Sequence, residues 1–316
     1  MNEFDLIARY FSPPTSHTFL AGGDDAALLV PSPGHVLAVT TDMLVEGTHF
    51  LPTVDPESLG HKVLAVNLSD IAAMGARPKW AFLSLALPAV DEAWIAAFAR
   101  GFLSLARRYD VDLAGGDTTR GPRNFNVTLV GEVPASQALR RDGAKEGEDL
   151  WVSGCTGEAA LGLRVRLGQA LLDPVDAARC AGRLEWPEPR VSLGRLLADL
   201  ATSAIDISDG LAADVGHIGE RSSLQACIEW ERLPQSSAFA TIDESGRRGC
   251  ILAGGDDYEL AFTAPASRRR AIEQVARLAG VPVTRIGVMR AGRGVTIVAG
   301  DGRALEFGNG GFDHFR

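Results

Sequence analysis

The order of apolar and polar positions divides the first half of the chain into alternating strand-like and helix-like stretches. Short runs rich in Val, Leu and aromatic residues predict strands, and longer stretches with apolar residues every three or four positions predict helices. The pattern predicts helices over 4–11, 56–74 and 91–109, and strands over 26–30, 35–41, 80–87, 111–114 and 125–133. Strands that alternate with helices favour an α/β or α+β layered fold.

The alternation starts again in the second half. Strands are predicted over 150–153, 204–207, 224–230, 258–262, 284–289 and 295–298, and helices over 158–167, 175–182, 190–200, 211–220 and 268–278. Between the halves, residues 134–149 contain Pro, Ser, Gln and the charge-rich stretch R-R-D-G-A-K-E-G-E-D, which is typical of a domain junction. We therefore expect two domains, residues 1–136 and 137–316.

Composition narrows the class of protein. With 46% hydrophobic and 22% charged residues, the 316-residue chain is expected to fold throughout. Its formal net charge of -9 argues against a nucleic-acid-binding surface, which needs an excess of basic residues. The four cysteines form no C-x-x-C pair, and no run reaches the roughly 18 apolar residues of a membrane span. We expect a cytoplasmic protein without a membrane segment.

Six aspartate clusters stand at the ends of apolar or glycine-rich runs, and none has Lys or Arg immediately beside it. They are G-G-D-D ending at Asp25, T-T-D at Asp42, N-L-S-D at Asp70, G-G-D at Asp117, D-I-S-D at Asp209 and G-G-D-D at Asp257. Hard oxygen ligands favour Mg²⁺ or Ca²⁺. The pattern indicates a metal-dependent site for an anionic ligand.

Each cluster also has a structural interpretation, because Asp after Gly or Ser forms turns and Asp before a helix caps it. Asp70 is the most informative, since an aspartate inside an otherwise apolar helix has poor propensity and no capping role. Thr40 and Thr41 add oxygens beside Asp42, although Thr is also an ordinary strand residue. A shared metal site is the favoured interpretation.

The segment Asp206-Ile207-Ser208-Asp209-Gly210 precedes a predicted helix. Its carboxylates could bind metal, Ser208 or Asp209 could cap the helix, and the N–H groups at the helix start could bind a phosphate. The cations nearest the clusters are Arg120, Arg140 and Arg141, and His49 follows Asp42 by seven residues. The sequence contains no P-loop, no G-x-G-x-x-G after a strand, and no convincing nucleophile arrangement.

Eight motifs run in order along nearly the whole chain: F-D-L-I-A-R-Y-F, G-D-D-A-A-L-L, T-T-D-M-L-V-E-G-T-H-F, K-V-L-A-V-N-L-S-D-I-A-A-M-G-A-R-P, G-G-D-T-T-R-G-P, A-I-D-I-S-D-G-L, G-G-D-D-Y-E-L and G-F-D-H-F. In these motifs the chain resembles the thiamine-monophosphate kinase family, which belongs with aminoimidazole ribotide synthetase and selenophosphate synthetase to a larger group of ATP-binding enzymes.

The resemblance implies transfer of the ATP γ-phosphoryl group to thiamine monophosphate, giving thiamine diphosphate and ADP. It also implies two α/β domains, the first with a mixed sheet through which homodimers form, and ATP bound between the domains and across that dimer. The implied Mg²⁺ ligands are Asp25, Thr40, Thr41, Asp42, Asp70, Asp117, Asp206 and Asp209. Among them Asp42, Asp70, Asp117 and Asp209 carry the catalytic role. The implied ATP contacts are Gly116, Asp117, Arg141 and Ser208, and the implied substrate contacts are His49, Asp256 and Phe312.

Two positions depart from the family pattern: the family usually has Glu where this chain has Asp256, and Tyr or Trp where it has Phe312. Phe312 still offers a ring face to a cationic thiazolium. Two other functions stay open: a sibling enzyme with another phosphoryl acceptor, and a non-catalytic protein that binds divalent cations or nucleotides. The sibling enzymes that use an N-terminal or C-terminal cysteine fit less well, because the first cysteine is Cys155 and the chain ends His314-Phe315-Arg316.

Overall fold

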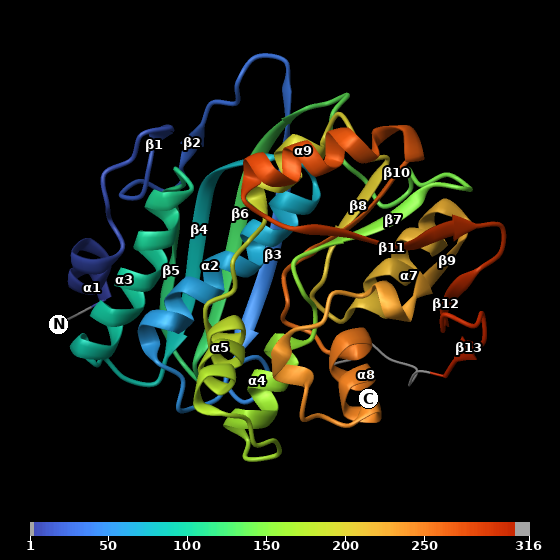
Figure 1. The fold of residues 1–316 in the computed structure, drawn as a ribbon. Coiled ribbons are helices and arrows are strands. Elements are labelled where there is room, and N and C mark those ends of the chain that lie inside the picture. Colours follow the sequence, from blue (N-terminus) through green and yellow to red (C-terminus); the bar gives the residue numbers. More distant parts are fainter. Residues whose placement is uncertain (1–2, 307–316) are drawn as a thin grey trace. The chain divides into compact units, whose positions relative to one another are not determined.

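The computed structural model describes residues 3–306, and contacts within the chain divide it into two compact units. Unit 1 contains residues 3–71 and 76–136, and unit 2 contains residues 72–75 and 137–306. The main boundary lies after Ser136. Each unit has its own sheet (Figure 1).

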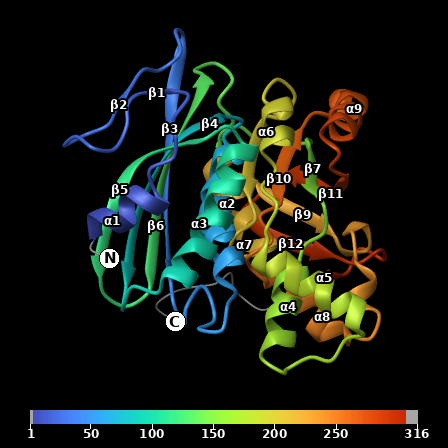
Figure 2. The ribbon, with the colours of Figure 1, turned by 90° about the vertical axis from the view of Figure 1, so that its left-hand side faces the viewer.

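Unit 1 is built on a four-stranded mixed sheet with the order β3-β6-β4-β5. Its strands are β3 (His35–Val45), β4 (Arg77–Leu87), β5 (Asp112–Arg120) and β6 (Asn124–Pro134). β4 and β5 are parallel, and the other pairs are antiparallel. Helices α2 (Pro56–Ala73) and α3 (Glu92–Arg108) cover one face of this sheet (Figure 2). α1 (Glu3–Tyr10) and the pair β1 (Thr18–Leu20) and β2 (Leu28–Leu29) lie beside the β5 edge.

The core of unit 1 lies between the sheet and these two helices. Alternate residues of β6, Phe125, Val127 and Leu129, are fully buried, as the two-residue period of a strand requires. α2 and α3 approach closely at glycines: a Cβ atom on Gly60 would lie 2.0 Å from the Phe98 carbonyl oxygen. The glycine therefore sets the distance at which α2 packs against α3.

Unit 2 contains a seven-stranded sheet with the order β13-β12-β9-β11-β7-β10-β8, in which only the pair β12–β9 is parallel. Its strands are β7 (Asp149–Ser153), β8 (Ser203–Asp206), β9 (Gln225–Glu229), β10 (Leu260–Ala264), β11 (Val283–Arg290), β12 (Gly294–Val298) and β13 (Ala304–Leu305). Its helices are α4 (Glu158–Arg166), α5 (Pro174–Glu185), α6 (Val191–Leu197), α7 (Leu211–Ser222), α8 (Glu244–Ala253) and α9 (Arg269–Ala279). Short 3₁₀ turns lie at Trp230–Arg232, Ser237–Phe239 and Ala266–Arg268. α7 packs on β8, β9 and β12.

The predicted mixed α/β fold is confirmed, but several element boundaries differ. β3 continues to Val45 and β5 to Arg120, so Asp42 and Asp117 lie inside strands and not at strand ends. The strand expected over 26–30 is reduced to Leu28–Leu29. α8 was not predicted, because Gly246 and Gly249 and three charged residues obscure its apolar period. Asp243 caps this helix by accepting a hydrogen bond from the Gly246 N–H group (2.7 Å).

Two further expectations concern the chain as a whole. Within residues 3–306, no helix is both long and apolar enough to cross a membrane. All four cysteines are free thiols, and Cys180, Cys227 and Cys250 are buried.

Candidate functional site

Two predicted ligands meet on the helix-covered face of the unit 1 sheet, and a third lies on the same face. Thr40 on β3 donates a short hydrogen bond from its hydroxyl to the carboxylate of Asp70, which lies inside α2. Asp42 is two residues further along β3 and therefore points to the same face as Thr40. It is half-buried opposite Val127 of β6. A hydroxyl and two carboxylates, all hard oxygen donors, thus lie on the same side of the sheet.

Thr41 lies on the other face of β3. Its hydroxyl oxygen accepts a hydrogen bond from Thr128 (3.2 Å) and another from the Asn126 amide (3.2 Å). The same Asn126 amide donates to the backbone carbonyl of Asp42 (3.2 Å). The Thr41 side chain is therefore separated from the group formed by Thr40, Asp42 and Asp70.

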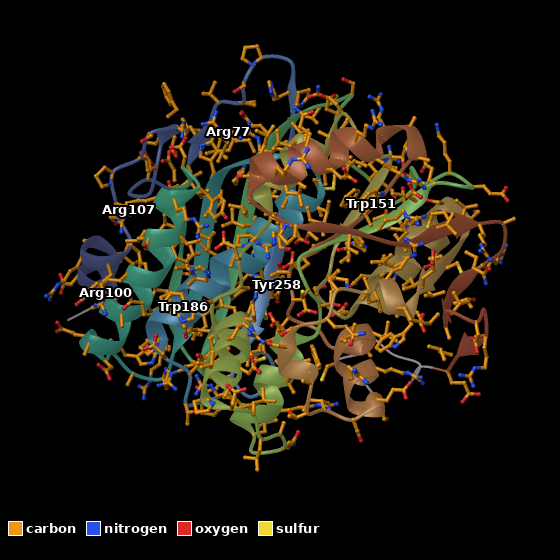
Figure 3. All side chains as sticks on the ribbon, viewed as in Figure 1. Arg77, Arg100, Arg107, Trp151, Trp186 and Tyr258 are labelled. Atoms are coloured by element: carbon orange, nitrogen blue, oxygen red, sulfur yellow. The ribbon has the colours of Figure 1, made fainter. Side chains whose placement is uncertain are left out.

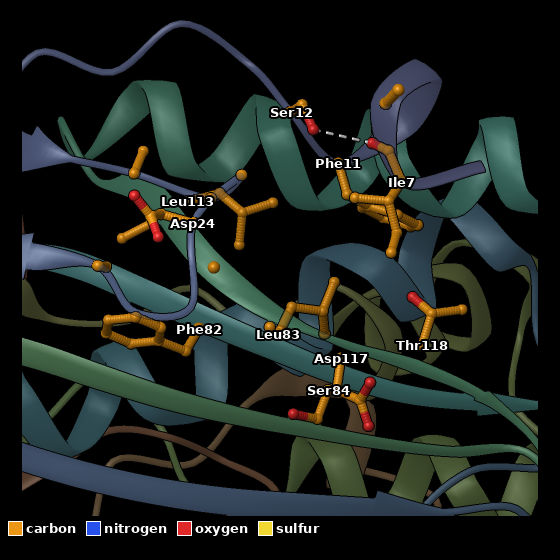
Figure 4. A pocket seen from close by; sticks show the side chains of 18 of the residues that line it. Ile7, Phe11, Ser12, Asp24, Phe82, Leu83, Ser84, Leu113, Asp117 and Thr118 are labelled. Carbon is orange, nitrogen blue, oxygen red and sulfur yellow. Dashed lines mark hydrogen bonds between the residues drawn. The ribbon is translucent and has the colours of Figure 1, made fainter. Parts of the chain in front are cut away.

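A cavity of about 1170 Å³ contains the second acidic group of unit 1. Its polar lining includes Asp24 and Asp25 from the loop after β1, Ser84 from β4, and Gly116 and Asp117 from β5. Figure 4 shows Ser84 and Asp117 side by side, with Asp24 on the loop that faces them. Apolar side chains line the rest of the cavity: Phe4, Ile7, Phe11, Phe82 and Leu113. The cavity therefore combines carboxylates with an aromatic and aliphatic wall.

The second glycine of the G-G-D motif that lines this cavity is required for steric reasons. Gly116 has φ +153°, and a Cβ atom at this position would lie 1.8 Å from the Leu83 carbonyl oxygen. Only glycine lets β5 approach β4 this closely. Asp117, the next residue, is thereby placed directly opposite Ser84 in the sheet register.

Two carboxylates that the sequence analysis missed hold the segment that carries Asp24 and Asp25. We call residues 16–32 the N-terminal strap. At its start, Asp112 of β5 accepts hydrogen bonds from the N–H groups of Ser16 (2.8 Å), His17 (2.6 Å) and Thr18 (2.8 Å). At its end, Glu132 of β6 accepts from the N–H group (2.6 Å) and the hydroxyl (2.9 Å) of Ser32. Burial alone would raise the pKa of Asp112, but these N–H donors hold it below its usual value.

The strand order separates the two acidic groups of unit 1. β3 and β5 are the outer strands, and Asp42 shares a row of the sheet with Val127, Leu83 and Gly116. Three strand spacings amount to about 14 Å between Asp42 and Gly116. Across the described residues, no three acidic, His or Cys side chains are close enough together to hold one metal ion. One chain therefore presents its predicted ligands as separate groups.

His49 lies in the loop after β3 and is half-buried. Its Nδ1 atom accepts a hydrogen bond from the Val45 N–H group (3.1 Å), which places the proton of the neutral ring on Nε2. The ring is therefore held in a fixed orientation.

Unit 2 brings two aspartate motifs together. The Asp256 N–H group donates to the Ser208 carbonyl (2.9 Å), and the Tyr258 N–H group donates to the Ile207 carbonyl (2.8 Å). A Cβ atom on Gly255 would lie 2.4 Å from the Ser208 carbonyl oxygen, so the glycine permits this approach. The segment Asp206–Asp209 and the G-G-D-D motif thus lie on adjacent loops.

A side chain of α7 occupies the N–H groups of the three residues that precede this helix. Those of Ser208 (3.0 Å), Asp209 (3.1 Å) and Gly210 (3.1 Å) all donate to Oδ2 of Asp214, a residue of α7 itself. Gly210 occupies the N-cap position, so neither Ser208 nor Asp209 caps the helix. Burial and then the charge of Asp209 raise the pKa of Asp214 to about 7, although the three N–H groups oppose this shift.

A buried ion pair supports the same region of unit 2. Arg190 donates to both carboxylate oxygens of Glu259, with a distance of 2.6 Å from its Nε atom, and the Ser153 hydroxyl donates to Glu259 as well (2.5 Å). Asp257 is half-buried and accepts from the Gly157 N–H group (2.7 Å), and desolvation raises its pKa well above the usual value. The side chains of Asp257 and Glu259 therefore anchor the end of the G-G-D-D motif to neighbouring parts of unit 2.

Arg141 and Phe312 are the remaining predicted site residues. Arg141 is exposed in the segment beside the edge strand β8, where the Arg140 carbonyl accepts from the Ala204 N–H group (3.2 Å). Phe312 lies outside the described residues.

Comparison of the sequence with known proteins shows the family of this chain. A thiamine-monophosphate kinase of Salmonella typhimurium is 44% identical over 319 aligned residues, which cover 99% of this chain and 98% of the relative. This chain belongs to the thiamine-monophosphate kinase family. The family predicted from the motifs is thereby confirmed, and the chain is an enzyme of the kinase class.

Solved structures of the thiamine-monophosphate kinase family have the same fold. The enzyme of Stenotrophomonas maltophilia is 45% identical, with a TM-score of 0.86 and 96% of each chain covered. A structure of AaThiL complexed with AMPPCP and TMP is 32% identical, with a TM-score of 0.79 and coverage of 90% of this chain and 89% of that one. Residues 23–133 also match the family described as AIR synthase related protein, N-terminal domain.

Proposed function

We propose that this enzyme transfers the γ-phosphoryl group of ATP to the phosphate of thiamine monophosphate, and that it requires Mg²⁺. The observation that carries the proposal is full-length similarity to thiamine-monophosphate kinases, one of which is a structure complexed with AMPPCP and TMP. The predicted acidic groups and the carboxylate-lined cavity support it.

The chemistry needs charge neutralisation more than proton transfer. The second pKa of a phosphate monoester is about 6, so at neutral pH the attacking oxygen of the acceptor is already largely ionised. No general base is required. Two polyanions must be held together for in-line transfer, and bound Mg²⁺ supplies the positive charge for this.

The donors present fit Mg²⁺, which prefers carboxylate and hydroxyl oxygens. We propose that one group consists of Thr40, Asp42 and Asp70, where the Thr40 hydroxyl already contacts the Asp70 carboxylate. The remaining proposed ligands are Asp25, Thr41, Asp117, Asp206 and Asp209. Gly116, Asp117, Arg141 and Ser208 are the proposed ATP contacts, and His49, Asp256 and Phe312 the proposed thiamine contacts.

We further propose that the enzyme works as a homodimer formed through the unit 1 sheet. Apolar side chains of β3 are exposed on the face that α2 and α3 leave uncovered, among them Leu37 (43% exposed), Val39 (63%) and Met43 (51%). The separation of β3 from β5 supports the same proposal, because a second copy can bring its own outer strand close to the acidic group of the first. The free cysteines and the use of ATP support a cytoplasmic location.

The proposal is tested by incubating the purified chain with ATP, Mg²⁺ and thiamine monophosphate and measuring thiamine diphosphate and ADP. We expect both products in equal amounts, and no turnover after Mg²⁺ is removed with EDTA. Asp42→Asn and Asp70→Asn should reduce turnover by at least about 100-fold without changing the melting temperature greatly.

A matched control is Asp173→Asn, which changes an aspartate that caps α5 away from the proposed ligands. It should keep wild-type turnover. ATP binding without product would support a non-catalytic nucleotide-binding protein, and ADP formation with a different acceptor would support a sibling enzyme. Wild-type turnover by Asp42→Asn and Asp70→Asn would remove these residues from the metal site.

A further inference from the structure

The buried carboxylate of Asp214 belongs to none of the proposed ligand or substrate contacts. It nevertheless accepts hydrogen bonds from the loop that carries three proposed site residues, Asp206, Ser208 and Asp209. Asp214 is 3% exposed and lies in the first turn of α7. A single oxygen, Oδ2, accepts from the consecutive N–H groups of Ser208, Asp209 and Gly210 at 3.0–3.1 Å. An ordinary capping side chain precedes its helix. Asp214 instead lies within its helix and reaches back to the loop before it.

These hydrogen bonds fix the direction of the loop backbone. Because the tetrahedral Cα links the backbone to Cβ, fixing the N–H groups of Ser208 and Asp209 also fixes the directions in which their side chains leave the chain. Backbone contacts complete the support: a Cβ atom on Gly210, which has φ +122°, would lie 2.9 Å from Ala253, and Gly255 packs on the Ser208 carbonyl. Asp214 is the one side chain whose hydrogen bonds to this loop run to three successive residues in the described structure.

We infer that Asp214 is a positioning residue that holds Ser208 and Asp209 in the geometry needed to bind Mg²⁺ and nucleotide. The inference rests on the proposed function. Asp214 itself is buried beneath the loop, so its effect is exerted through the backbone of residues 208–210. Residues that orient metal ligands in this way typically change metal affinity or activity by about 10–100-fold when they are replaced.

The test compares Asp214→Ala, which removes the acceptor, with Asp214→Asn, which keeps a carbonyl oxygen at the same place. Asp173→Ala is the matched control, because Asp173 also accepts two backbone N–H groups, those of Val175 and Asp176, at the start of α5. For each variant, initial rates are measured against Mg²⁺ concentration, and KM is measured separately for ATP and for thiamine monophosphate. Melting temperatures report the structural effect of each change.

We expect Asp214→Ala to raise the Mg²⁺ concentration for half-maximal rate by about tenfold or more, together with KM for ATP, and to leave KM for thiamine monophosphate within about threefold. Asp214→Asn should restore most of the Mg²⁺ response, and Asp173→Ala should lower only the melting temperature. An unchanged Mg²⁺ response in Asp214→Ala, or an equal loss in Asp214→Asn, would overturn the inference.

If Asp214→Ala does not fold, Asp214→Glu decides the matter, because it keeps the carboxylate and displaces it by one methylene. We then expect a raised Mg²⁺ requirement in a folded protein, and a wild-type requirement would contradict the inference. If the wild-type enzyme shows no turnover, the proposed function fails. The role of Asp214 is then judged by calorimetric binding of Mg²⁺-ATP to the same variants, with the same ranking expected.

Discussion

At the scale of single residues, backbone strain is concentrated in the G-G-D-D-Y motif. Asp256 has φ +68° and Tyr258 has φ +51°, two left-handed conformations that cost energy for residues other than glycine. The Tyr258 phenol donates a hydrogen bond to the Asp256 carboxylate (2.9 Å), and Tyr258 is buried. Figure 3 labels Tyr258 among the side chains of the structure. A side chain proposed to contact thiamine is thus held in an unusual backbone conformation by a neighbouring phenol.

The phenol can be removed without removing the ring. We expect Tyr258→Phe to raise KM for thiamine monophosphate by about three- to tenfold, because the net contribution of one hydrogen bond is typically about 1 kcal/mol. KM for ATP and the melting temperature should change little, since the ring still fills its buried position. Steady-state kinetics with each substrate varied in turn measures this difference. A similar change in both KM values would indicate that Tyr258 supports the whole loop and not Asp256 alone.

At the scale of elements, the N-terminal strap depends on carboxylates of the neighbouring strands. Asp112 accepts a fourth hydrogen bond, from the Thr18 hydroxyl (2.8 Å), in addition to the three from backbone N–H groups. A group whose pKa is lower in the folded than in the unfolded state stabilises the fold above its ordinary pKa, about 3.9 for Asp. That contribution is lost as the pH falls from this value through the lower pKa of the folded state.

Asp112→Asn should therefore reduce the free energy of unfolding by about 2 kcal/mol at pH 7, because charge-assisted hydrogen bonds are lost. The difference from the wild type should shrink as the pH falls below about 4, where the wild-type carboxyl also becomes protonated. Urea unfolding at a series of pH values measures both effects. Asp301→Asn, a change at an exposed acid in unit 2, is the control and should show neither. A difference that does not depend on pH would show that the charge of Asp112 contributes nothing.

At the scale of the whole molecule, the prediction of a homodimer rests on the exposed apolar side chains on the uncovered face of β3. We expect the wild-type chain to sediment as a dimer of 33.5 kDa subunits. Val39→Glu should shift it to monomers, because a charge placed in an apolar interface is costly to desolvate. Turnover should fall with dissociation if the proposed site needs both copies.

Leu278→Glu is the matched control, since Leu278 is 71% exposed on α9 of unit 2. It should leave both mass and turnover unchanged. A monomeric wild-type enzyme with full turnover would contradict the dimer and the shared site together.

Much of this molecule could be predicted from the sequence because the signals are local. Apolar period and turn residues predicted most helices and strands, and Asp70 was recognised because a charged residue inside an apolar helix is unusual. Family motifs then predicted the kinase. The unpredicted elements β1, α8 and β13 have weak local signals: two glycines interrupt the helix, and the strands contain only three and two residues.

The sequence by itself determined the alternating α/β plan and the acidic, hard-ligand chemistry, because these depend on residue type and on spacing along the chain. Only the tertiary structure decided which carboxylates bind the chain's own backbone, as Asp112 and Asp214 do, since hydrogen-bond partners distant in sequence leave no local pattern. It also decided that β3 and β5 are outer strands of one sheet. Strand order is set by long-range packing, and for that reason the distance between Asp42 and Asp117 could not be inferred from their motifs.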